Sequence, residues 1–86
     1  MKIIIADKAL KEIAKLGHVA SAKILDFLEE MEQNNIDSRS KGKELKGKFR
    51  KLWRYRVGDY RVISEIKDDI QIILVVRAGH RRNVYG

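Results

Sequence analysis

Hydrophobic and polar positions follow a helical period through the first part of the chain. A short β-branched run at residues 2–5 is typical of a strand. Apolar residues then recur at helical spacing, beginning with Leu10 and Ile13. We expect Asp7 to cap this first helix and Gly17 to end it, because these residue types are favoured at those positions.

A second helix is predicted from about residue 18 or 21 to about residue 34. Its apolar residues fall on one side and its acidic residues face water; the apolar ones are Ile24, Phe27, Leu28 and Met31. The polar, glycine-containing segment "QNNIDSRSKGKELKGK" then breaks the period. We interpret it as a connection with room for one helical turn around Glu44 and Leu45.

The rest of the chain alternates with the period of two that is typical of β-strands. Three strands are predicted, at about 49–57, 60–67 and 70–78. The first two are joined by Gly58-Asp59, a turn-forming pair between alternating runs and a good signal for a hairpin. The last strand, within "IQIILVVRAG", is nearly all apolar, so we expect it to be central with both faces at least partly covered.

A two-residue loop fixes the register of this hairpin and sorts its side chains into two faces. In this register Val57 lies opposite Tyr60 and Arg56 lies opposite Arg61. The face expected to pack on the helices holds Trp53, Tyr55, Val57, Tyr60, Val62 and Ile66. The other face holds Leu52, Arg54, Arg56, Arg61, Ile63 and Glu65.

These elements predict an α+β fold, with two N-terminal helices packed on a small, mostly antiparallel four-stranded sheet. We expect a single domain over residues 1–86, of which 44% are hydrophobic. The absence of cysteine excludes disulfides, thiolate zinc sites and a cysteine nucleophile. No apolar run approaches the roughly 18 residues of a membrane helix. The chain is therefore expected to be soluble and cytoplasmic, without membrane partners.

The net charge of +7 is concentrated in the second half of the chain. Residues 1–40 carry six basic and seven acidic residues, whereas residues 41–86 carry thirteen basic and five acidic residues. A one-sided basic surface is the usual electrostatic signature of a partner that carries phosphate. Scattered lysines can also be a solubilising surface, but this cluster is rich in arginine. We therefore expect a polyanionic or acidic partner.

Three arginines conflict locally with folding, because the predicted hairpin gathers them on one face. Arg56 and Arg61 lie directly opposite each other, and such like-charge pairs are unfavourable by about 1 kcal/mol or less. Glu65 on the same face can neutralise only part of the charge of Arg54, Arg56 and Arg61. Conflicts of this kind tend to mark functional sites, and guanidinium groups suit phosphate.

The C-terminal sequence "GHRRNVYG" adds an imidazole, two guanidiniums and a phenol within six residues. Together with "LWRYRVGDYRVI" and "ILVVRAGHRRNVY", it resembles the RelE/ParE toxin superfamily, and the RelE branch most closely. The resemblance covers nearly the whole chain. It implies a microbial RNase-like α+β fold and a toxin of a type II toxin–antitoxin pair. RelE-type members cleave mRNA in the ribosomal A site.

The resemblance also implies roles for individual residues. Arg61 matches the sheet arginine that contacts the scissile phosphate, and Arg81 matches the C-terminal arginine that stabilises charge or protonates the leaving oxygen. Tyr85 matches the tyrosine that stacks on the mRNA base. Arg54 takes the second position of the family's strand Lys-x-Lys pair, whereas Leu52 departs from the lysine at the first.

This departure leaves the general base open, because an arginine is a poor base at neutral pH. His80 is the better titrating candidate, since an unperturbed imidazole has a pKa near about 6.5. Lys48 or Lys51 can substitute only if the strand register brings one of them into the site.

The expected binding partners follow from the charge and from the resemblance. RNA backbone is expected to bind to Arg56, Arg82 and the lysines of 41–51, chiefly Lys46, Lys48 and Lys51. We expect no cofactor and no metal, because the two histidines lie 62 residues apart and the basic face has no acidic cluster. Ribosome and mRNA are the expected targets. A RelB-like antitoxin with an acidic or partly helical segment is expected to neutralise the chain and to carry any binding to operator DNA.

Three alternatives remain at the level of sequence. A ParE-type inhibitor of DNA gyrase has the same fold, and Leu52 favours it somewhat, whereas Arg61, Arg81 and Tyr85 disfavour it. A non-catalytic RNA- or DNA-binding module uses its arginines only to hold phosphate. A detoxified relative binds an antitoxin without cutting RNA.

Overall fold

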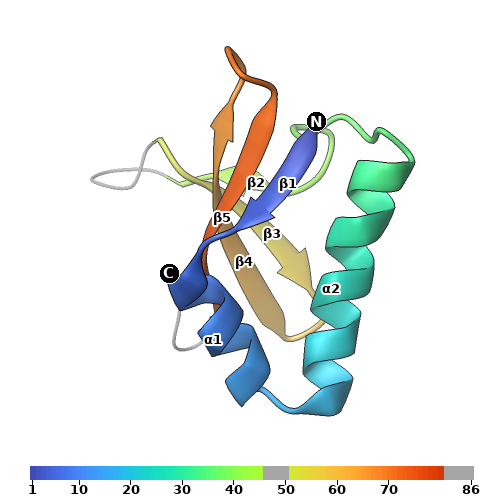
Figure 1. Ribbon diagram of the computed structural model, residues 1–86, viewed down its shortest axis with the longest axis vertical. Helices are drawn as coiled ribbons and strands as arrows, with labels where there is room; N and C mark the ends of the chain where they lie inside the picture. Colours follow the sequence, from blue (N-terminus) through green and yellow to red (C-terminus); the bar gives the residue numbers. More distant parts are fainter. Residues whose placement is uncertain (46–50, 81–86) are drawn as a thin grey trace.

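The computed structural model describes residues 1–45 and 51–80, which form a five-stranded mixed sheet and two helices (Figure 1). The strand order is β1-β5-β4-β3-β2. Strand β1 runs parallel to β5, and all other neighbours are antiparallel. The strands are β1 (Lys2–Ile5), β2 (Lys43–Glu44), β3 (Trp53–Val57), β4 (Tyr60–Lys67) and β5 (Ile72–His80).

The predicted α+β fold with two N-terminal helices is confirmed, but the prediction of four strands is wrong. The additional strand is β2, which pairs with β3 where we had expected a connection with room for a helical turn. Its two residues are too few to show an alternating pattern. Gly42, with a φ of +78°, turns the chain toward β3, and the Leu45 amide bonds to the Leu52 carbonyl at 2.9 Å.

Helix α1 (Asp7–Lys15) and helix α2 (His18–Gln33) follow each other with almost no connection. The N-cap of α1 is Ala6, so the prediction of an Asp7 cap is wrong by one residue. Asp7 lies in the first turn, where a carboxylate favours the positive end of the helix dipole. Gly17 does end α1 and has a φ of +89°, a conformation in which a side chain is strained.

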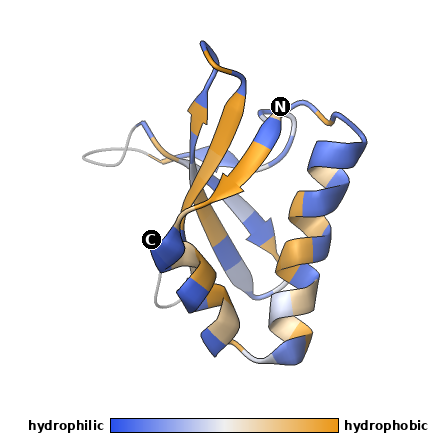
Figure 2. Ribbon diagram, viewed as in Figure 1, coloured by the Kyte–Doolittle hydropathy of each residue, from blue (hydrophilic) through white to orange (hydrophobic). Residues whose placement is uncertain are grey.

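The core lies between the helices and one face of the sheet, and Figure 2 shows the apolar sides of both helices turned toward the strands. Helix α2 contributes Ile24, Leu28 and Met31, as its period predicted, and Phe27 packs partly buried against them. The buried cluster comprises Ala9, Ile13, Ile24, Leu28, Met31, Tyr55, Val62, Ile73, Val75 and Ala78. No helix within residues 1–45 and 51–80 is long and apolar enough to cross a membrane.

The predicted β3–β4 register is confirmed at all five residue pairs, from Trp53 opposite Ser64 to Val57 opposite Tyr60. Strand β3 begins at Trp53, later than predicted. Strand β5 is central as expected, between β1 and β4, but it runs two residues later than the predicted range 70–78. The delay arises because residues 68–71 form the turn, in which Gln71 has a φ of +56°.

A β-bulge in β5 changes which side chains face the helices. From Lys67 to Ser64 the β4–β5 pairing is regular, with Ser64 opposite Val75. The next pair is Ile63 with Arg77, so β5 has one extra residue at this point. An extra residue transfers the following side chains to the other face. The bulge therefore places Arg77 beside Ile63 instead of beside Val62 in the core.

Candidate functional site

Strands β3 and β4 present three arginines on the face opposite the helices, which we call the arginine face: Arg54, Arg56 and Arg61. The side chains that alternate with them, Tyr55 and Val62, are completely buried in the core. Arg56 is exposed, whereas Arg61 is only 9% exposed. A strand alternates strictly, so burial of Tyr55 and Val62 forces the arginines to the other side. The sequence prediction of this face is confirmed in its geometry.

Within the arginine face, Arg56 and Arg61 are direct cross-strand partners, as predicted. On its other side Arg61 is paired with Gly79 of β5. Both Gly79 and Arg61 are buried at this point of the sheet. Of the paired arginines, Arg56 is the one that is exposed to an approaching phosphate, and its guanidinium suits charge-assisted hydrogen bonding.

Two further basic residues lie on the same face, of which Lys43 belongs to the lysines expected to hold RNA backbone and Arg77 was not predicted as a site residue. The register forms a row across four strands: Lys43 of β2, Arg54 of β3, Ile63 of β4 and Arg77 of β5. The place of Lys43 opposite Arg54 was not predicted, because β2 has no sequence signature. Arg77 was missed because the bulge that turns it to this face is not visible in an apolar run.

Ile63 is completely buried, although its face is opposite the helices. It lies in the row between Arg54 and Arg77, and the aliphatic stems of arginines are able to cover apolar neighbours. The arginine face therefore combines two buried residues, Ile63 and Arg61, with the exposed Arg56.

Arg77 is tied to helix α1 at the edge of the sheet. Its Nε lies 2.9 Å and 3.1 Å from the two carboxylate oxygens of Glu12, and the Ala78 amide donates to Glu12 Oε1 at 3.0 Å. Both side chains of the pair are about three-quarters buried, at 24% and 22% exposed. Glu12 thus accepts a backbone hydrogen bond from the edge of β5, beyond the point where its pairing with β1 ends.

Residues 38–41, between α2 and β2, are fixed by side chains of β3. Tyr55 donates a buried hydrogen bond from its hydroxyl to the Ser38 carbonyl at 2.7 Å. Trp53 donates from Nε1 to the Lys41 carbonyl, also at 2.7 Å. Burial raises the pKa of Tyr55 to about 12. The phenol therefore remains a donor over the whole physiological pH range.

Arg39 of the same segment reaches the β4–β5 turn. It makes a bidentate pair with Asp68 at 2.8 Å and 2.9 Å, and its guanidinium lies 5.9 Å from the centre of the Trp53 ring. The hydrogen bond from Arg39 holds the pKa of the Asp68 carboxyl below its usual value. Although Arg39 is a basic residue, its guanidinium is engaged in contacts within the fold.

A pocket of about 380 Å³ opens where β3 begins, next to the arginine face. Lys51 and Leu52 line it from the chain ahead of β3, and Glu65 and Ile66 line it from β4. Of the predicted RNA-binding residues, Lys51 is thus placed at this end of the face.

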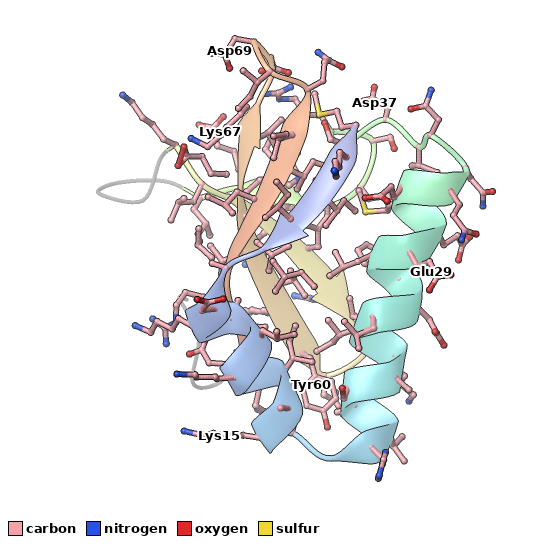
Figure 3. The ribbon with its side chains drawn as sticks, in the orientation of Figure 1. Lys15, Glu29, Asp37, Tyr60, Lys67 and Asp69 are labelled. Carbon is pink, nitrogen blue, oxygen red and sulfur yellow. The ribbon has the colours of Figure 1, made fainter. Side chains whose placement is uncertain are left out.

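His80 lies on the other side of the sheet from the arginine face. It is paired with Tyr60, and the two rings meet edge to face with centroids 5.9 Å apart. Tyr60 packs against the helix-side core. Figure 3 shows Tyr60 at the same end of the molecule as Lys15 and the connection between the helices, with Lys67 and Asp69 at the opposite end. The structure therefore does not bring His80 together with Arg54 and Arg61.

The other predicted site residues lie outside the described residues: Lys46, Lys48, Arg81, Arg82 and Tyr85. Within residues 1–45 and 51–80, no group of three or more His, Asp or Glu side chains is placed to hold a metal ion. The chemistry that the described part offers is phosphate binding and charge stabilisation by fixed guanidiniums.

Several solved structures with this fold are described as toxins or as toxin–antitoxin complexes. A chain of the RelBE2 toxin–antitoxin complex from Mycobacterium tuberculosis is 21% identical over 93% of this chain and 96% of that one, with a TM-score of 0.80. A chain of the archaeal RelE–RelB complex from Pyrococcus horikoshii is 22% identical over 96% of this chain and 97% of that one, with a TM-score of 0.69. The isolated RelE toxin of E. coli is 20% identical over 92% of this chain and 82% of that one, with a TM-score of 0.69. No curated protein sequence gives a significant match.

These likenesses show the fold, since the identities are low. The family comes from the sequence itself, because residues 3–85 match the family model described as the ParE toxin of the type II toxin–antitoxin system parDE. This match spans both helices and all five strands. The chain therefore belongs to the ParE toxin family, within the RelE/ParE superfamily of type II toxins.

Proposed function

We propose that the chain is a ribosome-dependent endoribonuclease that cleaves mRNA in the ribosomal A site and so inhibits translation. The observation that carries this proposal is the arginine face, which holds Arg54, Arg56 and Arg61 on a packed sheet. The fold shared with the RelE toxin of E. coli supports it. We further propose that residues 1–86 form one toxin domain that acts in the cytoplasm.

Cleavage by attack of an RNA 2′-hydroxyl requires proton transfer and stabilisation of the charge on the phosphorane. In this proposal Arg54, Arg61 and Arg81 stabilise that charge, and Tyr85 stacks on the mRNA base. Backbone phosphates of mRNA and rRNA bind to the surrounding basic residues: Lys46, Lys48, Lys51, Arg56 and Arg82. No cofactor is required by this scheme.

The need for the ribosome has a physical reason. Guanidiniums bind phosphate at any orientation that fits their hydrogen bonds, so they do not by themselves align the 2′-oxygen with the leaving 5′-oxygen. A ribosome that holds the mRNA in line supplies this alignment, which is worth several kcal/mol of the barrier. A weakly acting site is then sufficient.

A cognate antitoxin is proposed as the second partner. The chain carries a charge of +7, so an acidic, partly helical segment complements it and can occupy the arginine face. Toxin–antitoxin complexes are known for several proteins of this fold, among them RelE–RelB of P. horikoshii and RelBE of E. coli. Operator DNA would then bind through the antitoxin.

Inhibition of DNA gyrase is the second candidate function. Two observations favour it: the matching family model is that of the ParE toxin, and Leu52 stands where the RelE pattern has a lysine. On this alternative the arginine face is a binding surface for gyrase or DNA and performs no chemistry.

One pair of assays separates the two functions. The purified chain, freed from antitoxin, is added to a translation extract and to a gyrase supercoiling reaction. Ribonuclease function predicts arrest of translation with cleaved mRNA and normal supercoiling, whereas loss of supercoiling with intact mRNA would contradict it. The double substitution Arg54→Gln and Arg56→Gln is expected to abolish the arrest, and Lys8→Gln with Lys11→Gln on exposed positions of α1 is the control of equal charge.

A further inference from the structure

The pocket of about 380 Å³ lies where strands β3 and β4 separate. The pairing of β3 with β4 ends at Trp53 and Ser64, whereas β4 continues beside β5 as far as Lys67. Within the part of the chain that the structure describes, β4 beyond Ser64 therefore has a paired strand on one side only. Glu65 and Ile66 point to opposite faces of the strand, yet both line the pocket. The pocket thus borders this uncovered edge of β4.

Glu65 connects the pocket with the arginine face. It follows Arg61 and Ile63 at every second position of β4, so it lies on the same face of the sheet. Ile63 is the cross-strand partner of Arg54, and two residues of a strand span about 7 Å. An RNA whose phosphate is bound by the arginines therefore has a base within reach of the pocket.

The pocket differs from the arginine face in its charge. Its described lining includes two basic and two acidic side chains, which are Arg39, Lys51, Glu44 and Glu65. The carboxylates repel the phosphate groups that the arginine face attracts. The other described lining residues are apolar or aromatic: Leu52, Trp53 and Ile66. Apolar walls with a few polar groups are typical of sites for small ligands, and a neutral, planar nucleobase fits this description.

The fold already holds the walls of this pocket in place. Trp53 donates from Nε1 to the Lys41 carbonyl at 2.7 Å, and the guanidinium of Arg39 lies 5.9 Å from the centre of its ring. Glu65 is paired with Lys67 at 2.8 Å, and both side chains are partly exposed. Exposed ion pairs contribute little to stability, so the Glu65 carboxylate remains available to a ligand.

A carboxylate selects among the four bases because it only accepts hydrogen bonds. Guanine offers two adjacent donors on its Watson–Crick edge, N1–H and the N2 amino group, which match the two oxygens of one carboxylate. Adenine, cytosine and uracil each place an acceptor beside their donor, and a carboxylate repels that acceptor. Enzymes that act on single bases read the Watson–Crick edge in this way.

Leu52 gains a role in this arrangement. It lines the pocket together with Glu65 and stands where the RelE pattern has a lysine. A lysine at this point would add a further cation to the pocket and compete with a base for the carboxylate. An apolar side chain contacts the base without this competition.

We propose that this pocket binds one unpaired guanine of the mRNA, beside the phosphate that the arginine face holds, and that Glu65 reads its Watson–Crick edge. Glu65 is then a specificity residue and takes no part in breaking the RNA. This inference rests on the proposed ribonuclease function and adds a sequence preference to it.

The test measures cleavage with mRNAs that differ in a single base, in or beside the A-site codon. Single-turnover rates on programmed ribosomes are measured for the wild type and three variants: Glu65→Gln, Leu52→Lys and Glu30→Gln. Glu30→Gln makes the same change of charge on the exposed side of α2 and is the control. Ribosome binding of each protein is measured in parallel.

The wild type should cut roughly 10-fold or more faster with guanine at one position than with any other base there, since a bidentate contact to a base discriminates by this much. Glu65→Gln should lose this preference, because its amide offers one acceptor and one donor. Its rates with the other bases and its ribosome binding should change little. Leu52→Lys should lower the preference, and Glu30→Gln should keep it.

Equal rates of the wild type with all four bases at every position would overturn the inference and leave the ribonuclease function standing. So would a Glu65→Gln variant that keeps the guanine preference, or one that cuts every mRNA more slowly by the same factor. If Glu65→Gln weakens only binding of the antitoxin, the pocket is a protein contact and the inference fails. A wild-type chain that cuts no RNA under any condition would overturn the proposed function and this inference together.

Discussion

Glu12 of α1 and Arg77 of β5 are joined by an ion pair in which Arg77 Nε donates to both carboxylate oxygens, and the same carboxylate accepts the amide of Ala78. The pair lies where β1 has ended and β5 continues with an open edge. A carboxylate from a helix thus takes the place of a neighbouring strand. It holds the end of β5 that leads to Gly79, beside Arg61.

Replacing Glu12 by Gln should loosen this end of β5. Loss of a charge-assisted bond to a partly buried arginine is expected to cost about 1–2 kcal/mol in unfolding free energy. The measurement is hydrogen exchange by NMR, in which the Ala78 amide should exchange much faster than in the wild type. Glu30→Gln, on the exposed side of α2, is the control. Unchanged protection of Ala78 would show that the Glu12 bond does not hold the edge.

Alanine substitutions at two glycines should separate a steric clash from a backbone preference. Gly58 and Gly42 both have positive φ, at +60° and +78°, but a Cβ on Gly58 meets nothing within 4 Å. Gly58→Ala should therefore cost only about 1 kcal/mol. Gly42→Ala also drives Cβ into β3 and should cost on the order of 3 kcal/mol.

Urea unfolding followed by the fluorescence of Trp53, the single tryptophan, measures both effects. Because Trp53 Nε1 is 2.8 Å from a Cβ at position 42, the emission of native Gly42→Ala should also shift. Equal stability of the two variants would contradict the close approach of β2.

Tyr55→Phe should destabilise the protein and change its response to alkali. The substitution leaves the Ser38 carbonyl without its buried donor, which costs about 1–3 kcal/mol. The pKa of Tyr55 is about 12 in the folded protein, against about 10 in an unfolded chain. A raised pKa means that the protonated form stabilises the fold, fully below pH 10, and that this contribution is lost as the pH rises toward 12.

The measurement is the free energy of unfolding of both proteins between pH 8 and pH 12. The difference between wild type and Tyr55→Phe should shrink above pH 10. A difference that stays constant across this range would contradict the burial of the phenol.

Binding to RNA should weaken as salt rises, and the arginine face should set the slope. Each phosphate contact contributes about one unit to the dependence of log K on log salt. Arg56→Gln removes an exposed guanidinium and should reduce the slope by about one. Titration of ribosomes at several salt concentrations measures this, with Lys8→Gln as the control. Equal slopes for Arg56→Gln and the wild type would place Arg56 outside the interface.

The sequence was most informative where strong local signals meet. Gly58-Asp59 between alternating runs predicted the β3–β4 register to the residue, and with it the joint placement of Arg54, Arg56 and Arg61. The apolar period of α2 likewise identified Ile24, Leu28 and Met31 as core residues.

Two features of the site could not be predicted, for different physical reasons. Strand β2 exists because Gly42 lets the backbone approach β3. This is a tertiary contact, and a strand of two residues is too short to show a pattern in the sequence. The bulge in β5 moves the side chains that follow it to the other face of the sheet. It lies within a run whose residues are apolar on both faces of the strand, so no polar residue marks the shift. As a result the pairing of Lys43 with Arg54 was not predicted, Arg77 was missed, and His80 was not expected on the face of Tyr60.

The central claim is tested most directly by mapping RNA ends. The purified chain, free of antitoxin, is incubated with a defined mRNA, with and without ribosomes stalled at a known codon, and all new 5′ ends are sequenced. The account predicts cuts within the A-site codon that appear only when ribosomes are present. Intact mRNA in both reactions, with a chain that still arrests growth, would contradict it and reduce the arginine face to a binding surface.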